Sequence, residues 1–334
     1  MKALLSFFEP FILMLLATVA LASVLPAQGQ WRDVVSIVAN AAIVLLFFLH
    51  GAKLSRQAII DGARHWPLHL AGLGLTFGLF PLIGIAFAQL PMFDGSLRTG
   101  ILFLAVLPST VQSSIAFTAM ARGNVAAAVC SASFSNLVGI FLTPLLVALL
   151  IHANGPAGIS WDAARTIILQ LLLPFIAGHA LRPLIGGFVA RHKPLVTVVD
   201  RGSILLVVYS AFGAAVLNGI WTMVNGSDLL ALGTLSLTQL AIVLLLAWNL
   251  GKWLGFKRED RIVLLFCGSK KSLASGVPMA GVLFPAATVG LVILPLMLFH
   301  QIQLIICAVL ARRLGEEPPA AHAPLPDDSG VAAA

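Results

Sequence analysis

Charged side chains are scarce in this chain, since only 10% of its 334 residues are Asp, Glu, Lys or Arg. Soluble globular proteins carry about 25% charged residues, which lie mainly on their surface. Hydrophobic residues make up 59% of the sequence, and the mean hydropathy is +1.01. This shortage of charge excludes a soluble fold and predicts a protein that crosses a lipid bilayer several times.

Acidic residues are absent from the middle of every long apolar segment. All thirteen Asp and Glu residues lie at segment ends, in loops or in the C-terminal tail, and Glu9, near the start of the first segment, is the only borderline case. A carboxylate at mid-membrane is the usual group that binds a coupling cation or relays a proton. The sequence therefore indicates no such carboxylate.

Cysteine is rare too, and Cys130, Cys267 and Cys307 lie in apolar segments without paired spacing. They indicate neither a disulfide nor a metal site. The net charge of +7 could suggest nucleic acid, but the basic residues are scattered over short loops without interleaved aromatic residues. We therefore expect no nucleic-acid partner, and we attribute the positive charge to the membrane.

Ten apolar segments are each long enough to span a bilayer, which predicts an all-α integral membrane protein with ten transmembrane helices. The first segment could instead be a signal peptide, but it is long and nine more segments follow, so we interpret it as a retained helix. The predicted spans are residues 4–26, 33–53, 66–90, 97–121, 124–151, 163–182, 201–221, 229–254, 262–285 and 287–311.

The basic residues lie mainly on one side of these spans. Of the 20 Lys and Arg residues, two lie inside a span, three lie on one side (Arg32, Arg98 and Arg165), and the remaining fifteen lie on the other side. Because cytoplasmic loops are the ones rich in Lys and Arg, both termini are predicted to be cytoplasmic, with the chain in the cell (inner) membrane. This arrangement requires an even number of spans.

The two basic residues inside a span, Lys270 and Lys271, stand in the sequence GSKKSLASG of the ninth segment. Each charge would cost about 2.5 to 3.5 kcal/mol at the centre of a lipid-exposed helix, so both lysines are expected to face protein, water or an anion. A hydrated helix end is the alternative, but Lys257 to Arg261 already mark that end. Small polar neighbours favour backbone that unwinds and lines a cavity. These neighbours include Ser269, Ser272 and Ser275.

The fourth segment carries a similar polar interruption next to Pro108, formed by Ser109, Thr110, Gln112, Ser113 and Ser114. Ten helices divide into two halves of five, and an odd number per half predicts an inverted repeat. The halves are residues 4–151 and 163–311 of one transporter domain (1–311), and residues 312–334 are predicted to be a disordered cytoplasmic tail. Interrupted spans at corresponding positions of the two halves point to a transport site. The alternative is that these serines only form hydrogen bonds between packed helices.

Three further polar residues are candidates for the pathway. Asn136, in the fifth segment, could line the cavity or make an interhelical hydrogen bond. His300 and Gln301 lie in the tenth segment. Histidine titrates near neutrality, which suits a proton-linked group, although a hydrogen-bonded structural histidine is the alternative.

Four short motifs stand out in the sequence, namely HGAKLS (50–55), ARGNVAAAV (121–129), CGSKKSLASG (267–276) and FHQIQL (299–304). They resemble the bile acid:sodium symporter family, and together they are typical of a symporter-like branch that includes uncharacterised bacterial proteins and member seven of the human bile-acid carrier family. The resemblance covers residues 4–311. It implies a core domain of spans three to five and eight to ten, and a panel domain of spans one, two, six and seven. The substrate would lie in the cleft between them, next to the broken fourth and ninth helices.

The sodium sites of that family are only partly kept. In sodium-coupled relatives a glutamate of the ninth helix serves both sites, and Ser269, followed by Lys270, stands at its position here. Fifth-helix hydroxyl ligands fall on Ala128 and Ala132. An ammonium about 4 Å from Na⁺ would cost roughly 4 kcal/mol at an effective dielectric constant of about 20, which disfavours sodium there. No other cofactor is expected, and the hydroxyls that would bind sodium are those of Ser113, Ser114 and Ser269.

The first functional hypothesis is a secondary carrier of a small organic anion, not an enzyme. The lysines would attract the anion, or one of them would act as a proton-linked switch in place of sodium. Because neighbouring helical residues point about 100° apart, Lys270→Ala and Lys271→Ala are expected to behave differently.

Two other hypotheses remain. One is a regulator of ion (calcium) homeostasis that keeps a carrier fold without substantial transport. The other, an intramembrane enzyme with a Ser272/Lys271 pair, is disfavoured because nothing in the sequence suggests an oxyanion hole. The sequence does not identify the substrate or the oligomeric state.

Overall fold

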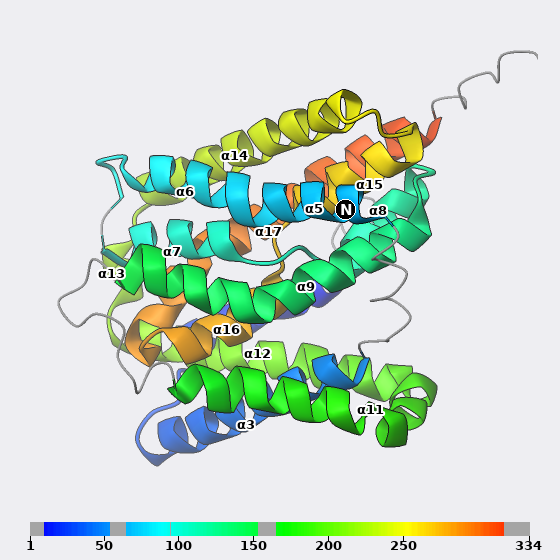
Figure 1. The fold of residues 1–334 in the computed structure, drawn as a ribbon. Helices are drawn as coiled ribbons and strands as arrows, with labels where there is room; N and C mark the ends of the chain where they lie inside the picture. The colour runs from blue at the N-terminus through cyan, green and yellow to red at the C-terminus, as the bar shows by residue number, and fades with distance from the viewer. Residues whose placement is uncertain (1–9, 54–64, 94, 153–164, 317–334) are drawn as a thin grey trace, which may run out of the picture.

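The computed structural model describes residues 10–53, 65–93, 95–152 and 165–316, and these residues form helices without any strand (Figure 1). Seven helical stretches among them are long and apolar enough to cross a membrane. They are Gln30–Lys53, Trp66–Ala88, Val125–Ile151, Arg165–Arg191, Lys193–Leu217, Gly226–Trp253 and Ala286–Glu316. The all-α prediction is therefore confirmed, and these stretches suit a protein that crosses a membrane several times.

The helices of the first half of the chain are α2 (Pro10–Val24), α3 (Gln30–Lys53), α5 (Trp66–Gly74), the π-helix η1 (Leu75–Leu79), α6 (Phe80–Ala88), α7 (Gly95–Val106), α8 (Gln112–Met120), α9 (Val125–Val147) and the π-helix η2 (Ala148–His152). Those of the second half are the π-helix η3 (Ile168–Leu172), α11 (Leu173–Arg191), α12 (Lys193–Leu217), α13 (Ile220–Met223), α14 (Gly226–Trp253), α15 (Arg258–Gly268), α16 (Leu273–Leu283) and α17 (Ala286–Glu316).

Within the described residues, each of the ten predicted spans overlaps a helical stretch or a pair of helices. Helix α11 continues to Arg191, past the predicted end at residue 182. Helix α12 begins at Lys193, before the predicted start at residue 201, because hydropathy marks only the apolar part of a helix. Helix α17 continues to Glu316, so residues 312–316 of the predicted tail are helical. The rest of that tail lies outside the described residues. The number of membrane crossings stays a prediction.

Two of the predicted spans are interrupted where the sequence contains proline or clustered serine. Helix α7 ends at Val106 and α8 begins at Gln112, and Pro108 between them has no N–H with which to continue a helix. Helix α15 ends at Gly268, and the Ser272 hydroxyl caps the start of α16 by accepting the Ser275 N–H at 3.1 Å. The interruptions touch, because the Ser272 N–H donates to the Pro108 carbonyl at 2.9 Å.

The helices form two groups. Helices α3, α11 and α12 pack together with α2, and the first three lie along the lower edge of Figure 1. The second group contains α5 to α9, α14, α15 and α17. Helices α16 and α17 contact α12, so the interrupted region lies next to the boundary between the groups.

Glycine permits a very close approach between α3 and α11. A Cβ atom on Gly51 of α3 would overlap the carbonyl oxygen of Phe175, and a Cβ atom on Gly178 of α11 would overlap the carbonyl oxygen of Phe48. Backbone therefore contacts backbone across this pair of helices, as is common where small residues line a membrane-helix interface.

A turn of the first half is bonded to a helix of the second half. Asn124 caps α9, because its side chain accepts the Ala127 N–H at 3.0 Å. The Asn124 N–H also donates to the Glu259 carbonyl at 3.2 Å, and its amide nitrogen donates to the Asp260 carboxylate at 2.9 Å. These bonds tie the α8–α9 turn to the start of α15.

Candidate functional site

A cleft of about 400 Å³ opens between the α3–α11–α12 group and the interrupted helices. This volume is within the usual range for a small-molecule site. The wall on the α2, α3, α11 and α12 side includes Phe11, Phe47, His50, Lys53, Phe175, Thr197, Asp200, Arg201 and Ile204. The opposite wall includes Val111, Leu137, Ile140, Leu273, Ala274, Met279 and Leu304. The cleft is thus largely apolar with polar groups at separate places.

About half of the predicted site residues line this cleft. They are Thr110, Gln112, Ser113, Asn136, Ser272, Ser275 and His300. The structure does not bring the others to it, namely Ser109, Ser114, Ser269, Lys270, Lys271 and Gln301. Most of the latter set lie behind the interruption, inside the second group of helices. The sequence thus predicted the region of the site, but it did not predict which side chains point into the cleft and which point away from it.

Asn136 of α9 connects the two interrupted spans. Its amide nitrogen donates to the Ser109 carbonyl at 2.8 Å and to the Ala132 carbonyl at 3.0 Å. Its amide oxygen accepts the Ser275 hydroxyl at 2.8 Å. Asn136 therefore both lines the cleft and makes interhelical hydrogen bonds, so the two alternatives considered for it are compatible.

The N-termini of α8 and α16 both lie at the cleft wall, since Val111 to Ser113 and Ser272 to Ser275 belong to its lining. The first N–H groups of a helix have no partner within the helix, and the N-terminus carries a partial positive charge. Two such ends on one cleft favour a negatively charged group there.

Lys271 is buried away from the cleft and is fully hydrogen-bonded. Its side chain has no exposed surface, and its ammonium donates to the carbonyls of Thr76, Ala105 and Leu107 at 2.7, 2.8 and 2.7 Å. Its backbone N–H and carbonyl both bond to the side-chain amide of Gln303, each at 2.9 Å. The lysine is therefore fixed at both ends.

Lys270 is equally buried but has different surroundings. Its amine lies 3.8 Å from the centre of the Phe117 ring and 5.5 Å from that of Phe266. This amine is without a hydrogen-bond partner among the described residues. Adjacent lysines thus have one saturated and one unpaired amine, which agrees with the expectation that the two residues are not equivalent.

His300 receives a hydrogen bond that fixes its tautomer. Because Gln303 accepts the Lys271 N–H through Oε1, its Nε2 is the donor, and this nitrogen lies 2.8 Å from His300 Nδ1. Nδ1 must therefore accept, which leaves Nε2 as the N–H donor of the neutral ring. Gln303 was not among the predicted site residues, although its spacing of three from His300 places both on one helix face.

The hydroxyls expected to bind sodium have other partners in this structure. Thr110 Oγ1 lies 2.9 Å from the Ser113 hydroxyl and 2.8 Å from the Ser114 hydroxyl. Ser114 also donates to the Phe266 carbonyl at 3.1 Å, and Ser269 donates back to the Leu265 carbonyl at 2.5 Å. Sodium binding at these residues stays a prediction.

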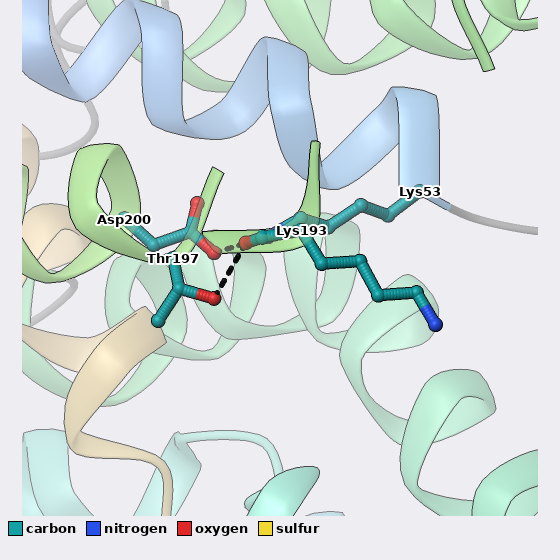
Figure 2. Close-up of polar contacts among 4 residues, drawn as sticks. All are labelled: Lys53, Lys193, Thr197 and Asp200. Carbon is teal, nitrogen blue, oxygen red and sulfur yellow. Dashed lines mark hydrogen bonds and ion pairs between the residues drawn. The ribbon is translucent and has the colours of Figure 1, made fainter. Parts of the chain in front are cut away.

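A basic group that sequence reasoning missed lies on the α3 and α12 wall of the cleft. Lys53 of α3 forms an ion pair with Asp200 of α12, and their side chains are 36% and 19% exposed. Figure 2 shows this pair beside Thr197, whose hydroxyl donates to the Lys193 carbonyl at 2.9 Å, while the Lys193 amine points away from it. Arg201 lines the cleft next to Asp200. The only sequence signal is that these charges lie at span ends on the same predicted side.

Comparisons with known proteins find a matching family and similar chains. A model described as the SBF-like CPA transporter family matches residues 9–316. The chain is 59% identical to the Pseudomonas aeruginosa protein named "Uncharacterized protein PA2026". It is 53% identical to the Escherichia coli protein named "Putative symporter YfeH". Each of these alignments extends over 307 residues and covers 91% of this chain and 92% of the relative. It is 27% identical to the rat "Sodium/bile acid cotransporter 7" over 278 residues, 82% of each chain.

Proposed function

Because the chain belongs to the SBF-like CPA transporter family, we propose that it is a secondary-active carrier that moves a small organic anion across the membrane by alternating access. Relatives that are named symporter and sodium/bile acid cotransporter support transport, not catalysis. The single observation that carries the choice of an anion is the cleft, on which two helix N-termini and a basic group converge.

The proposed architecture has ten membrane spans in two inverted halves. The interrupted pairs α7/α8 and α15/α16 would be the fourth and ninth spans, and each is followed by one long helix, α9 or α17. The α2, α3, α11 and α12 group would be the panel domain and the remaining helices the core domain. Both termini would be cytoplasmic, in the inner membrane, because that side then has fifteen of the 20 basic residues.

The anion would lie with its charged group toward the N-termini of α8 and α16 and its apolar body against the aromatic wall. His300 offers a further N–H donor, and Phe11, Phe47 and Phe175 offer apolar surface. Lys53 and Arg201 would attract the anion at the opposite wall. This arrangement favours an amphipathic carboxylate or sulfonate over a small inorganic ion.

We propose a proton as the coupling ion and Lys270 as its carrier. The support is that the Lys270 amine is buried and unpaired, whereas the Lys271 ammonium already has three acceptors. The titratable groups close enough to influence the charge of Lys270 are Cys267, Cys307 and His300. Lys270 would take up a proton when a rearrangement exposes its amine to water, and it would release the proton when the amine is buried again, because burial destabilises the charged form.

Uptake into proteoliposomes tests this function. The probes are amphipathic carboxylates and sulfonates with their neutral amides as controls, driven in turn by a proton gradient and by a sodium gradient. We expect uptake of an anion, not of its amide, under the proton gradient. Uptake driven by sodium alone would contradict the assignment of the coupling ion. Folded protein that takes up no anion would favour the alternative, a carrier-fold regulator of calcium homeostasis.

Asn136→Leu is expected to reduce anion uptake at least about tenfold, because it removes three hydrogen bonds that join Ser109, Ala132 and Ser275 at the cleft. Initial uptake rates at equal amounts of folded protein measure the effect. Asn249→Leu is the matched control, since the Asn249 amide is exposed and donates only to the Leu245 carbonyl of its own helix. Equal rates for both variants would contradict a role of Asn136 in the cleft.

Neutralising one partner of the Lys53–Asp200 ion pair at a time is expected to shift the anion affinity in opposite directions for the two partners. Lys53→Gln should raise the KM about threefold to tenfold, because it removes an attractive charge and leaves the Asp200 carboxylate to repel the anion. Asp200→Asn should lower the KM, since it frees the Lys53 ammonium. Both shifts should shrink as salt is added. Lys193→Gln is the control, because its amine points away from the pair (Figure 2).

A further inference from the structure

Three main-chain carbonyls converge on one point inside the second group of helices. The Lys271 ammonium occupies this point, at 2.7 Å from Thr76 O, 2.8 Å from Ala105 O and 2.7 Å from Leu107 O. Three acceptors match the three N–H bonds of an ammonium, so no donor is left over. The oxygens come from η1, from α7 and from the interruption that follows α7.

The sequence explains why these carbonyls are free. In the π-helix η1 the Phe80 N–H donates to the Leu75 carbonyl, five residues earlier. By the same spacing, the donor for the Thr76 carbonyl would be the backbone nitrogen of Pro81, which has no hydrogen. Ala105 would bond the Ser109 N–H in a continued helix, but that group donates to the Ser135 hydroxyl at 3.0 Å. Leu107 lies beyond the end of α7. Proline and the interruption thus leave three acceptors without backbone partners.

Such a set of oxygens has the chemistry of a monovalent-cation site. Rings of backbone carbonyls replace the hydration shell of potassium in ion channels. Aromatic faces add to the attraction, because the Lys271 amine lies 4.1 Å from the centre of the Phe80 ring. The Lys270 amine also faces an aromatic ring, that of Phe117 at 3.8 Å, but it has no carbonyl or other hydrogen-bond partner among the described residues.

We propose that the Lys271 ammonium is a tethered substitute for a monovalent cation, in a site formed by the carbonyls of Thr76, Ala105 and Leu107. The native chain then requires no ion from solution at this point. Removal of the amine opens a site for potassium, ammonium or sodium. The proposal concerns the folded state and does not depend on which solute is transported.

The test is thermal unfolding of the purified full-length protein in detergent, with KCl, NaCl or NH₄Cl exchanged for choline chloride at constant ionic strength. The variants are Lys271→Ala and, in case this fails to fold, Lys271→Ser. We expect a saturable rise in Tm of about 5 °C or more when the cation is about 100-fold above its Kd. Wild type and Lys270→Ala should show no saturable cation-specific rise.

The outcomes are distinct. A rise in either Lys271 variant that Lys270→Ala lacks supports the site. A folded variant that responds to none of the three cations overturns it, as does failure of both variants to fold even when potassium or ammonium is present throughout. A cation response of equal size in wild type and in the Lys271 variants also overturns it, because the response would then not depend on removal of the amine. Since the readout is unfolding, these outcomes are independent of anion uptake.

Discussion

Lys271→Met is expected to destabilise the protein by about 3 kcal/mol or more, because it leaves three buried carbonyls without a hydrogen-bond donor. The methionine side chain fills most of the same volume but donates no hydrogen bond, so the carbonyls of Thr76, Ala105 and Leu107 lose their partner in a region without exposed surface. Each unsatisfied carbonyl costs about 1 to 3 kcal/mol. Unlike a shortened side chain, methionine leaves no room for an ion. The Tm in detergent should therefore fall in all salts.

Lys270→Met is the matched control, because the residues are adjacent and equally buried. Its amine makes no hydrogen bond that would be lost. Replacing a buried charge by an apolar side chain of similar volume is often neutral or stabilising, so the Tm should stay the same or rise. If both variants were destabilised equally, burial alone would explain the lysines, and the account based on the three carbonyls would be wrong.

Gly178→Ala is expected to destabilise the protein by about 3 kcal/mol or more, although it adds one methyl group. The new Cβ would overlap the Phe48 carbonyl oxygen, which belongs to the backbone of α3 and cannot rotate away. Relief requires α3 and α11 to separate along a contact that runs through Gly51 and Phe175 as well. Overpacking of this kind usually costs about 1 to 3 kcal/mol, and more where backbone blocks the adjustment.

The measurement is the Tm and the size-exclusion profile of the detergent-solubilised protein. Gly233→Ala in α14 is the control, because its Cβ would meet no atom within 4 Å. That substitution should stabilise the helix by up to about 1 kcal/mol, since alanine has the higher helix propensity. A Gly178→Ala protein that unfolds at the wild-type temperature would show that α3 and α11 do not need this contact.

The all-helical class followed from composition and hydropathy, because long apolar segments with so few charges leave little choice. The positions of both interruptions followed from Pro108 and from the Ser and Lys residues near Gly268. The family resemblance drawn from four short motifs is confirmed by the match over residues 9–316. These features are local in sequence, so a single chain suffices to predict them.

The direction of the two lysines could not be derived in the same way. Residues 269–272 are not helical, so the angular offset of neighbouring helical residues does not apply to them. The partners of Lys271 are carbonyls more than 160 residues earlier in the chain, freed by Pro81 and by the end of α7. The Lys53–Asp200 pair depends likewise on how α3 packs against α12.

The corner at Asn124 has a mechanical consequence for any motion of this protein. Its bonds to Glu259 and Asp260 join the turn that follows one interrupted span to the helix that starts the other. These hydrogen bonds join the two interrupted spans at this end, so one span cannot slide past the other unless the bonds break. In a rearrangement that opens the cleft, both interrupted spans must therefore move together as one rigid unit. Their movement would be relative to α3, α11 and α12.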